Sequence, residues 1–292
     1  MVQQKEPLRE VALRELAWYR VLTLKQILQL SGYKNEHWAR DQLNMLRQKE
    51  YLYLRMPYLS KGRLPGAYQL LPKGKRYLEE QKIDVPYVVQ NVQKLQSIGS
   101  MSLQHTIGVN DVFIMLHLLT VQYPDRFQLL KRIHEREMSQ YLTKRDGGVE
   151  PDGFFQININ HSGQWKKQSC FLEYERTTAY ADMEKFQQRI RNYLLLFDNT
   201  TKLEALFGVK YPSLMIVVDD AMRVPILTTY GARVLHDCQK TEWESRFLFS
   251  SRDTSLTPIQ FFCSHRWLRA WLPLLPPVAY FTDQEDLLQS LT

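Results

Sequence analysis

The sequence has few cysteines and no long apolar segment. Its three cysteines, Cys170, Cys238 and Cys263, are far apart and show no C-x-x-C spacing. This distribution argues against a disulfide framework and a zinc site, and it favours a reducing compartment. No window of about 18 residues is uniformly apolar, so we expect no transmembrane helix. The first residues also lack the apolar core of a signal peptide. A cytoplasmic protein is therefore expected.

Several common catalytic motifs are missing as well. The chain has no phosphate-binding loop of the G-x-x-x-x-G-K-(S/T) type, no G-x-G-x-x-G and no Ser-His-Asp order. ATPase, dehydrogenase and serine hydrolase are therefore poor interpretations. With 292 residues and 44% hydrophobic content, the chain is long enough for two domains with separate cores.

Positive charge is concentrated near the N-terminus. The whole chain carries a net charge of +7, and residues 34–82 contain 11 Lys/Arg against 5 Asp/Glu, a local excess of +6. A local basic patch is the electrostatic footprint of phosphate binding. A solvated surface that happens to be basic remains the alternative.

The first fifty residues predict short helices around a glycine-containing turn. Apolar spacing predicts helices over 8–19, 24–30 and 36–49, with Thr23 and Asn35 as N-caps of the second and third. In the third helix Trp38, Leu43 and Leu46 are expected to face the core. This order is typical of a helix-turn-helix.

A predicted hairpin follows the helices. Strands are expected over 51–55 and 67–71, on either side of a basic turn, Lys61-Gly62-Arg63, and a last helix begins near Pro72. The order resembles winged-helix DNA-binding domains, including the Y-x-L-x-x-x-G spacing of Tyr68, Leu70 and Gly74. The resemblance implies double-stranded DNA as partner, with a homodimer as one possibility. Base contacts are expected from Arg40, Asn44, Arg47 and Gln48, and phosphate or minor-groove contacts from Lys61 and Arg63. A domain used for protein contacts is the alternative.

We place a domain boundary in a linker over residues 83–100. The expected division is a winged-helix domain over 1–82 and a second domain over 101–292. A strong helix begins near Leu103, and its apolar stripe includes Asp111. A carboxylate there needs a partner or a metal, because burying it bare is costly. An Asp at the rim of the stripe that reaches solvent is equally compatible.

Acidic residues cluster around a second predicted hairpin. A strand is expected to end near Asp152, a polar turn covers 160–167, and a hydrophobic strand ends on Glu173 and Glu175. Glu173 and Glu175 share one side of their strand, and adjacent strands would bring Asp152 to them. Lys185 lies on the next helix. Such a cluster could hold Mg²⁺ or Mn²⁺ beside a scissile phosphate. A salt-bridged strand end with Arg176 is the structural alternative.

The last third alternates strands and helices. Residues 211–220 and 246–251 predict core strands, and residues 224–236 predict a helix between them. The alternation favours an α/β (α+β) domain with a mixed central sheet.

The acidic motifs resemble a known superfamily. Pro151-Asp152, a hairpin and F-L-E-Y-E are similar to the PD-(D/E)XK nucleases. More narrowly, the chain from about Leu8 to Leu196 resembles the replication-relaxation family of bacterial plasmids and mobile elements. The shared motifs are the winged-helix start, H-x-x-x-x-N-D (His105, Asn110, Asp111), P-D, E-x-(D/E)-R (Glu173, Glu175, Arg176) and a K-to-Y helix (Lys185, Tyr193).

This resemblance implies a restriction-endonuclease-like second domain and a DNA-handling role, with other replication or mobile-element proteins as possible partners. The implied catalytic residues are Asp152, Glu173, Glu175 and Lys185, and the implied metal ligands are Asp152, Glu173 and Asp111. Glu175 stands where the superfamily usually has lysine, and Lys185 is the candidate substitute. Two functions therefore stay open, a metal-dependent endonuclease or nickase and a non-catalytic regulator or adaptor.

Overall fold

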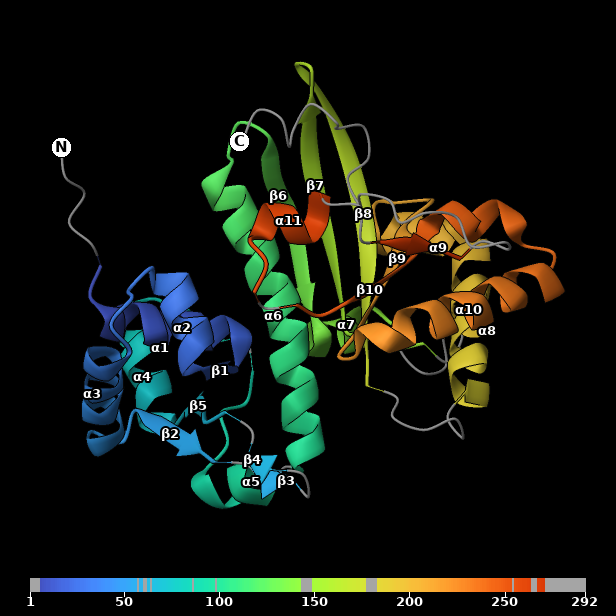
Figure 1. Ribbon diagram of the computed structural model, residues 1–292. Coiled ribbons are helices and arrows are strands. Elements are labelled where there is room, and N and C mark those ends of the chain that lie inside the picture. The colour runs from blue at the N-terminus through green and yellow to red at the C-terminus, as the bar shows by residue number, and fades with distance from the viewer. Residues whose placement is uncertain are drawn as a thin grey trace. The chain divides into compact units, whose positions relative to one another are not determined.

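The computed structural model describes residues 6–56, 58–59, 62–63, 65–85, 87–97, 99–142, 149–176, 183–253, 255–263 and 267–270 (Figure 1). The chain divides into two compact units, residues 1–114 and 115–292. The division falls inside helix α6 (Ser100–Gln122), C-terminal to the linker expected over 83–100. No helix in the described part of the chain is long and apolar enough to cross a membrane.

The first unit places helices against a small antiparallel sheet, as the mixed α/β prediction requires. Its elements before α6 are α1 (Leu8–Tyr19), β1 (Val21–Thr23), α2 (Leu24–Ser31), α3 (Glu36–Gln48), β2 (Leu52–Arg55), β3 (Tyr58–Leu59), β4 (Gly62–Arg63), β5 (Ala67–Leu70), α4 (Pro72–Glu80) and α5 (Val92–Ser97). Three strands pair in the order β1-β5-β2, and β3 pairs with β4 separately. The expected caps are confirmed, because Thr23 and Asn35 accept backbone N–H groups of Gln26 and Trp38.

One expected core position of α3 is wrong. Ala39, Leu43 and Leu46 form its buried stripe, whereas Trp38 is 38% exposed and contacts the ring of Tyr33. Ala39 and Leu43 are four residues apart, and Leu46 follows three later, so they share one helix face. Trp38 lies one position outside that face.

Gly74 explains part of the Y-x-L-x-x-x-G spacing in physical terms. Helix α4 passes so close to the strand region that a Cβ at Gly74 would lie 2.4 Å from the carbonyl oxygen of Tyr51. The same oxygen accepts the backbone N–H of Leu71, so it cannot move away cheaply. Gly74→Ala is therefore expected to lower the free energy of unfolding by about 1–3 kcal/mol. Urea unfolding would measure this, with Gly99→Ala as control, because a Cβ at Gly99 meets nothing within 4 Å.

The start of α6 is joined to the first unit by buried polar groups. Asn110 is fully buried and donates to the carbonyls of Tyr19 and Val21, at 3.1 and 2.6 Å. The side-chain amide of Gln26 donates to the Asp111 carboxylate at 2.6 Å and to the Ile107 carbonyl at 2.9 Å. Asn110 and Asp111 of the H-x-x-x-x-N-D motif thus tie α6 to α1, β1 and α2.

The second unit is built on a six-stranded mixed sheet of order β11-β10-β9-β8-β7-β6. Its elements are β6 (Phe127–His134), α7 (Glu135–Tyr141), β7 (Gly153–His161), β8 (Gln164–Glu175), α8 (Met183–Asp198), α9 (Thr200–Phe207), β9 (Ser213–Val218), η2 (Ala221–Arg223), α10 (Val224–Asp237), η3 (Thr241–Arg246), β10 (Phe247–Ser251), α11 (Pro258–Cys263) and β11 (Leu268–Arg269). Strands β8, β9 and β10 are parallel, and the other pairs are antiparallel. The predicted mixed sheet is confirmed.

The β7–β8 hairpin differs in detail from the sequence prediction. Asp152 precedes β7 instead of ending a strand, and the turn is only Ser162-Gly163. Both turn residues have positive φ, 48° and 86°, and the Asn160 side chain accepts the N–H of Gly163. Positive φ at two consecutive central residues matches the twist of hairpin strands. The strands therefore stay paired up to His161 and Gln164.

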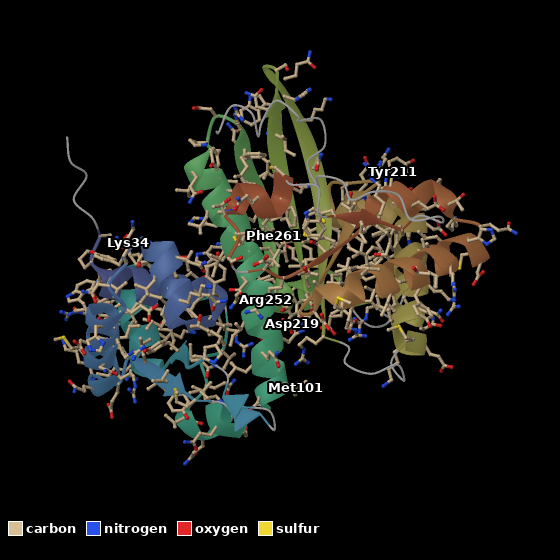
Figure 2. All side chains as sticks on the ribbon, viewed as in Figure 1. Lys34, Met101, Tyr211, Asp219, Arg252 and Phe261 are labelled. Atoms are coloured by element: carbon tan, nitrogen blue, oxygen red, sulfur yellow. The ribbon has the colours of Figure 1, made fainter. Side chains whose placement is uncertain are left out.

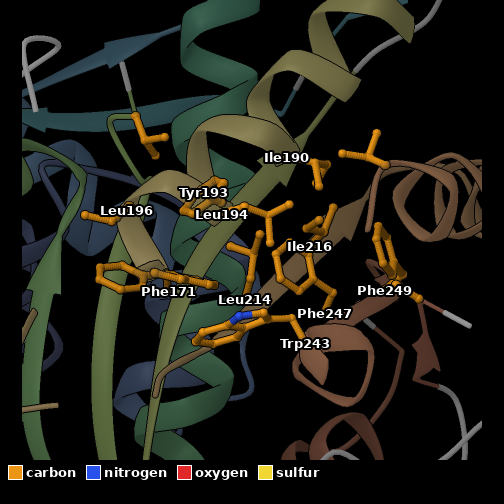
Figure 3. Packing of buried hydrophobic residues seen from close by; sticks show 14 of the residues in the cluster. Phe171, Ile190, Tyr193, Leu194, Leu196, Leu214, Ile216, Trp243, Phe247 and Phe249 are labelled. Carbon is orange, nitrogen blue, oxygen red and sulfur yellow. The ribbon is translucent and has the colours of Figure 1, made fainter. Parts of the chain in front are cut away.

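Helices α8, α9 and α10 share an aromatic core with one face of the sheet (Figure 3). Phe171 of β8 lies within ring contact of Phe154, Phe197 and Phe207, and Ile190 and Tyr193 of α8 belong to the same cluster. Burial of such rings is a main source of stability. Because Phe171, Glu173 and Glu175 alternate along β8, the two glutamates share the face that α8 covers.

Candidate functional site

The hairpin register brings the predicted acids of the second unit together. Gly153 pairs with Leu172, and the backbone N–H of Asp152 donates to the Leu172 carbonyl at 3.0 Å. One further step in this register sets Asp152 beside Glu173. The Asp152 carboxylate also accepts the backbone N–H of Tyr174 at 2.7 Å. Asp152, Glu173 and Glu175 are all buried, with 6–8% of each residue exposed. We call these three residues the acidic cluster.

Helix α8 supplies a cation to the acidic cluster, Arg189. Its Nη1 lies 2.5 Å from Glu175 Oε2 and 3.4 Å from Glu173 Oε2. The sequence predicts a cation from Arg176 or Lys185 and does not assign this role to Arg189. A signal was present, since Lys185, Arg189 and Tyr193 recur every four residues and share one helix face.

Tyr193 closes the buried side of the acidic cluster. It is fully buried, and its hydroxyl donates to Glu173 Oε1. Burial and the nearby Glu173 raise the pKa of the Tyr193 phenol well above its usual value, so it remains a donor. This contact gives a structural reason for the tyrosine of the K-to-Y helix.

Glu173 holds its proton far more tightly than an ordinary carboxyl group. Burial, and then the neighbouring Asp152, raise its pKa to about 8, against the opposing influence of Arg189 and the Tyr193 hydrogen bond. Two carboxylates in a shared buried site cannot both ionise easily. At neutral pH Glu173 is therefore mostly protonated in this arrangement.

The donor set of the acidic cluster fits a divalent cation in type. Mg²⁺ and Mn²⁺ are divalent cations that prefer carboxylate oxygens, and three buried carboxyl groups belong to this cluster. Such a cation would offset their negative charge. Asp152, Glu173 and Glu175 are the residues that would hold it. Arg189 contacts two of them and would compete for the same oxygens.

Two other predicted residues of this site lie in different surroundings. Lys185 is exposed on α8, one turn before Arg189. Asp111 belongs to the first unit, where Gln26 provides the partner that a carboxylate on an apolar stripe requires. Its assignment as a metal ligand stays a prediction.

The opposite face of β8 carries a second polar cluster, which the sequence pattern does not single out. The Tyr174 hydroxyl donates to Asp219, and Arg252 Nη1 lies 3.1 Å from Asp219 Oδ1 and 3.2 Å from the Tyr174 oxygen. Asp219 and Arg252 directly follow β9 and β10 (Figure 2). The three residues therefore link the C-terminal ends of three neighbouring parallel strands.

In the first unit, α3 presents polar residues beside a groove. Arg40, Arg47 and Gln48 are exposed, Asn44 is half-buried, and Arg47 donates to the Asn44 side-chain oxygen at 2.9 Å. The groove has a volume of about 840 Å³. Residues of α3, β2 and the start of α4 line it, including Asn44, Arg47, Gln48, Tyr53, Lys73 and Arg76. Lys61 lies outside the described residues. Arg63 pairs through its backbone with Tyr58, and its side chain is not described.

Comparison with known proteins places this architecture in a family. The family model for replication-relaxation matches residues 13–207, which cover most of the first unit and the acidic cluster with α8. No curated protein and no solved structure matches the chain. The matched segment includes Asn110, Asp152, Glu173 and Tyr193, whose contacts are described above. Since the match extends over more than half of the sequence, the chain belongs to the replication-relaxation family.

Proposed function

We propose that the protein binds double-stranded DNA through a winged helix in the first unit, as part of a replication or mobilisation process. The supporting observation is the row of Arg40, Asn44, Arg47 and Gln48 on α3 beside a groove that Lys73 and Arg76 also line. Arginine and amide side chains can contact guanine and adenine edges, and flanking cations neutralise phosphates. The family points to the same process.

A charge-reversed double variant tests duplex binding. Arg40→Glu/Arg47→Glu is expected to weaken duplex affinity by at least about tenfold, because both attraction and base contacts are lost. Fluorescence anisotropy at several salt concentrations would measure the affinity and its salt slope. Arg233→Glu, at an exposed arginine of α10, is the matched control. Equal weakening by both variants would show a general charge effect and contradict a site on α3.

The acidic cluster supports a second function, metal-dependent cleavage of DNA. The observation that favours it is the hairpin register that sets Asp152 beside Glu173 in one buried site, where burial and then Asp152 raise the pKa of Glu173. A bound Mg²⁺ or Mn²⁺ would polarise a phosphodiester and lower the pKa of bound water. In this proposal Asp152, Glu173 and Glu175 hold the cation, and Lys185 stabilises phosphate charge. If cleavage is absent, the same architecture serves as a DNA-binding regulator or adaptor.

Incubation with supercoiled plasmid separates cleavage from binding alone. Parent protein with Mg²⁺ or Mn²⁺ is expected to give relaxed or linear DNA, and Asp152→Ala is expected to give neither. The Asp152→Ala variant should still shift duplex DNA in a gel. Intact plasmid beside a salt-sensitive gel shift would exclude cleavage and favour the adaptor.

A further inference from the structure

A basic pocket lies at the edge of the second unit where the parallel strands β9 and β10 begin. Its volume is about 470 Å³. Lys210 precedes β9, Arg246 precedes β10, Lys167 comes from β8 and Arg269 from β11. Ser169, Ser213 and Ser245 add hydroxyl groups, and no described residue that lines the pocket is acidic. The acidic cluster is at the other, C-terminal end of β8.

The cations of this pocket are weakly compensated. Lys210 lies 3.3 Å from Glu204, but both side chains are 55% exposed, and exposed pairs contribute little. Arg246 donates to the backbone carbonyl of Tyr211 at 2.5 Å, which offers no full negative charge. The Nε of Arg269 is shielded from solvent and has no hydrogen-bond partner among the described residues. A buried donor of this kind fits an anionic ligand.

An exposed aromatic ring stands at the rim of the same pocket. Tyr211 is 57% exposed. Its side chain is labelled in Figure 2. The Arg246 guanidinium lies 5.7 Å from its ring centroid, and Trp243 lies 6.2 Å away, centroid to centroid. Tyr211 and Arg246 also line a neighbouring cavity of about 410 Å³, together with Asp198 and Glu242. The two cavities share the Tyr211 ring and the Arg246 guanidinium, and the excess of cations belongs to the larger one.

We propose that this pocket binds single-stranded nucleic acid. Lys167, Lys210, Arg246 and Arg269 take backbone phosphates, and Tyr211 stacks on an unpaired base. A cationic pocket with an exposed aromatic ring suits a single strand, because every base offers a flat face once it is unpaired. A duplex hides those faces. All of these residues belong to the second unit, so the inference does not depend on duplex binding by the first.

Anisotropy with a short fluorescent oligothymidylate tests the proposal on the full chain. Tyr211→Ser is expected to weaken binding about tenfold, and Tyr211→Phe is expected to bind like the parent, because stacking needs the ring and not the hydroxyl. Lys167→Glu/Lys210→Glu is expected to weaken binding at least about tenfold and to flatten its salt dependence. Lys166→Glu is the matched control, since Lys166 is an exposed neighbour that does not line the pocket. Circular dichroism would verify that each variant is folded.

Each result bears directly on the pocket. Loss of oligothymidylate binding in the pocket variants, with duplex binding retained, supports the proposal. It is overturned if the parent fails to bind, or if Lys166→Glu weakens binding equally. Loss confined to Arg40→Glu/Arg47→Glu would assign single-strand binding to α3. If millimolar inorganic phosphate displaced the oligothymidylate completely, the pocket would be a simple anion site. That result would contradict base stacking on Tyr211.

Discussion

Arg189→Met is expected to lower the free energy of unfolding by about 2–3 kcal/mol. Removing one partner of a buried ion pair typically costs about 3–5 kcal/mol. The lower figure applies because the Arg189 side chain is 41% exposed, whereas the side chains of Glu173 and Glu175 are 8% exposed. Methionine keeps most of the length of the side chain. The decrease in unfolding free energy therefore measures the lost charge interaction more than lost packing. Urea unfolding followed by circular dichroism would measure it.

The same variant gives a readout for metal binding that does not depend on cleavage. Without Arg189 the acidic cluster keeps its oxygens but loses the guanidinium that contacts Glu173 and Glu175. Mg²⁺ or Mn²⁺ is therefore expected to raise the melting temperature of Arg189→Met in a saturable way, and EDTA should reverse the rise. Arg191→Met, on the same helix, serves as control. An unfolding free energy equal to that of the parent would contradict the role of Arg189.

Glu173→Gln is expected to stabilise the protein at alkaline pH. The native pKa of Glu173 is about 8, against an ordinary value of 4.5. Between these pH values the native state retains a proton that the unfolded state releases. The contribution of Glu173 to the free energy of unfolding is therefore fully present below pH 4.5 and is lost as the pH rises to about 8. Glutamine mimics the protonated form at every pH. At alkaline pH the free energy of unfolding of the variant should therefore exceed that of the parent by on the order of 2–4 kcal/mol.

Unfolding measured across the pH range would test both the sign and the window. The difference between Glu173→Gln and the parent should grow with rising pH and level off above about pH 8. Glu175→Gln is the matched control on the same strand face, and it should destabilise, because it breaks the 2.5 Å contact with Arg189. A constant difference at all pH values would mean that Glu173 does not titrate in this window.

Local chemistry allowed much of the fold to be predicted. Thr23 and Asn35 cap helices because their side chains accept neighbouring N–H groups, a short-range effect that the sequence displays directly. The meeting of Asp152 and Glu173 was also predictable, because period-two alternation and a turn determine hairpin pairing.

The partners that come from distant parts of the chain were not predictable in the same way. The contact of Arg189 with Glu173 and Glu175 depends on how α8 is rotated on the sheet. Packing of Phe186, Ile190 and Phe197 sets that rotation. Asp111 meets Gln26, 85 positions earlier in the chain. Neither periodicity nor capping chemistry contains that information.

The length of the β7–β8 hairpin determines whether the residues of the acidic cluster meet. Nine consecutive residue pairs, from His161–Gln164 to Gly153–Leu172, lie between the turn and Asp152. Loss of one residue from β8 would invert its faces beyond that point and direct Glu173 away from Arg189, and loss of one residue from β7 would displace Asp152 in the same way. Length changes near Ser162-Gly163 could therefore disable the cluster while every acidic residue remained in the sequence. The number of residues between Asp152 and Glu173 is therefore as necessary to the acidic cluster as the acids themselves.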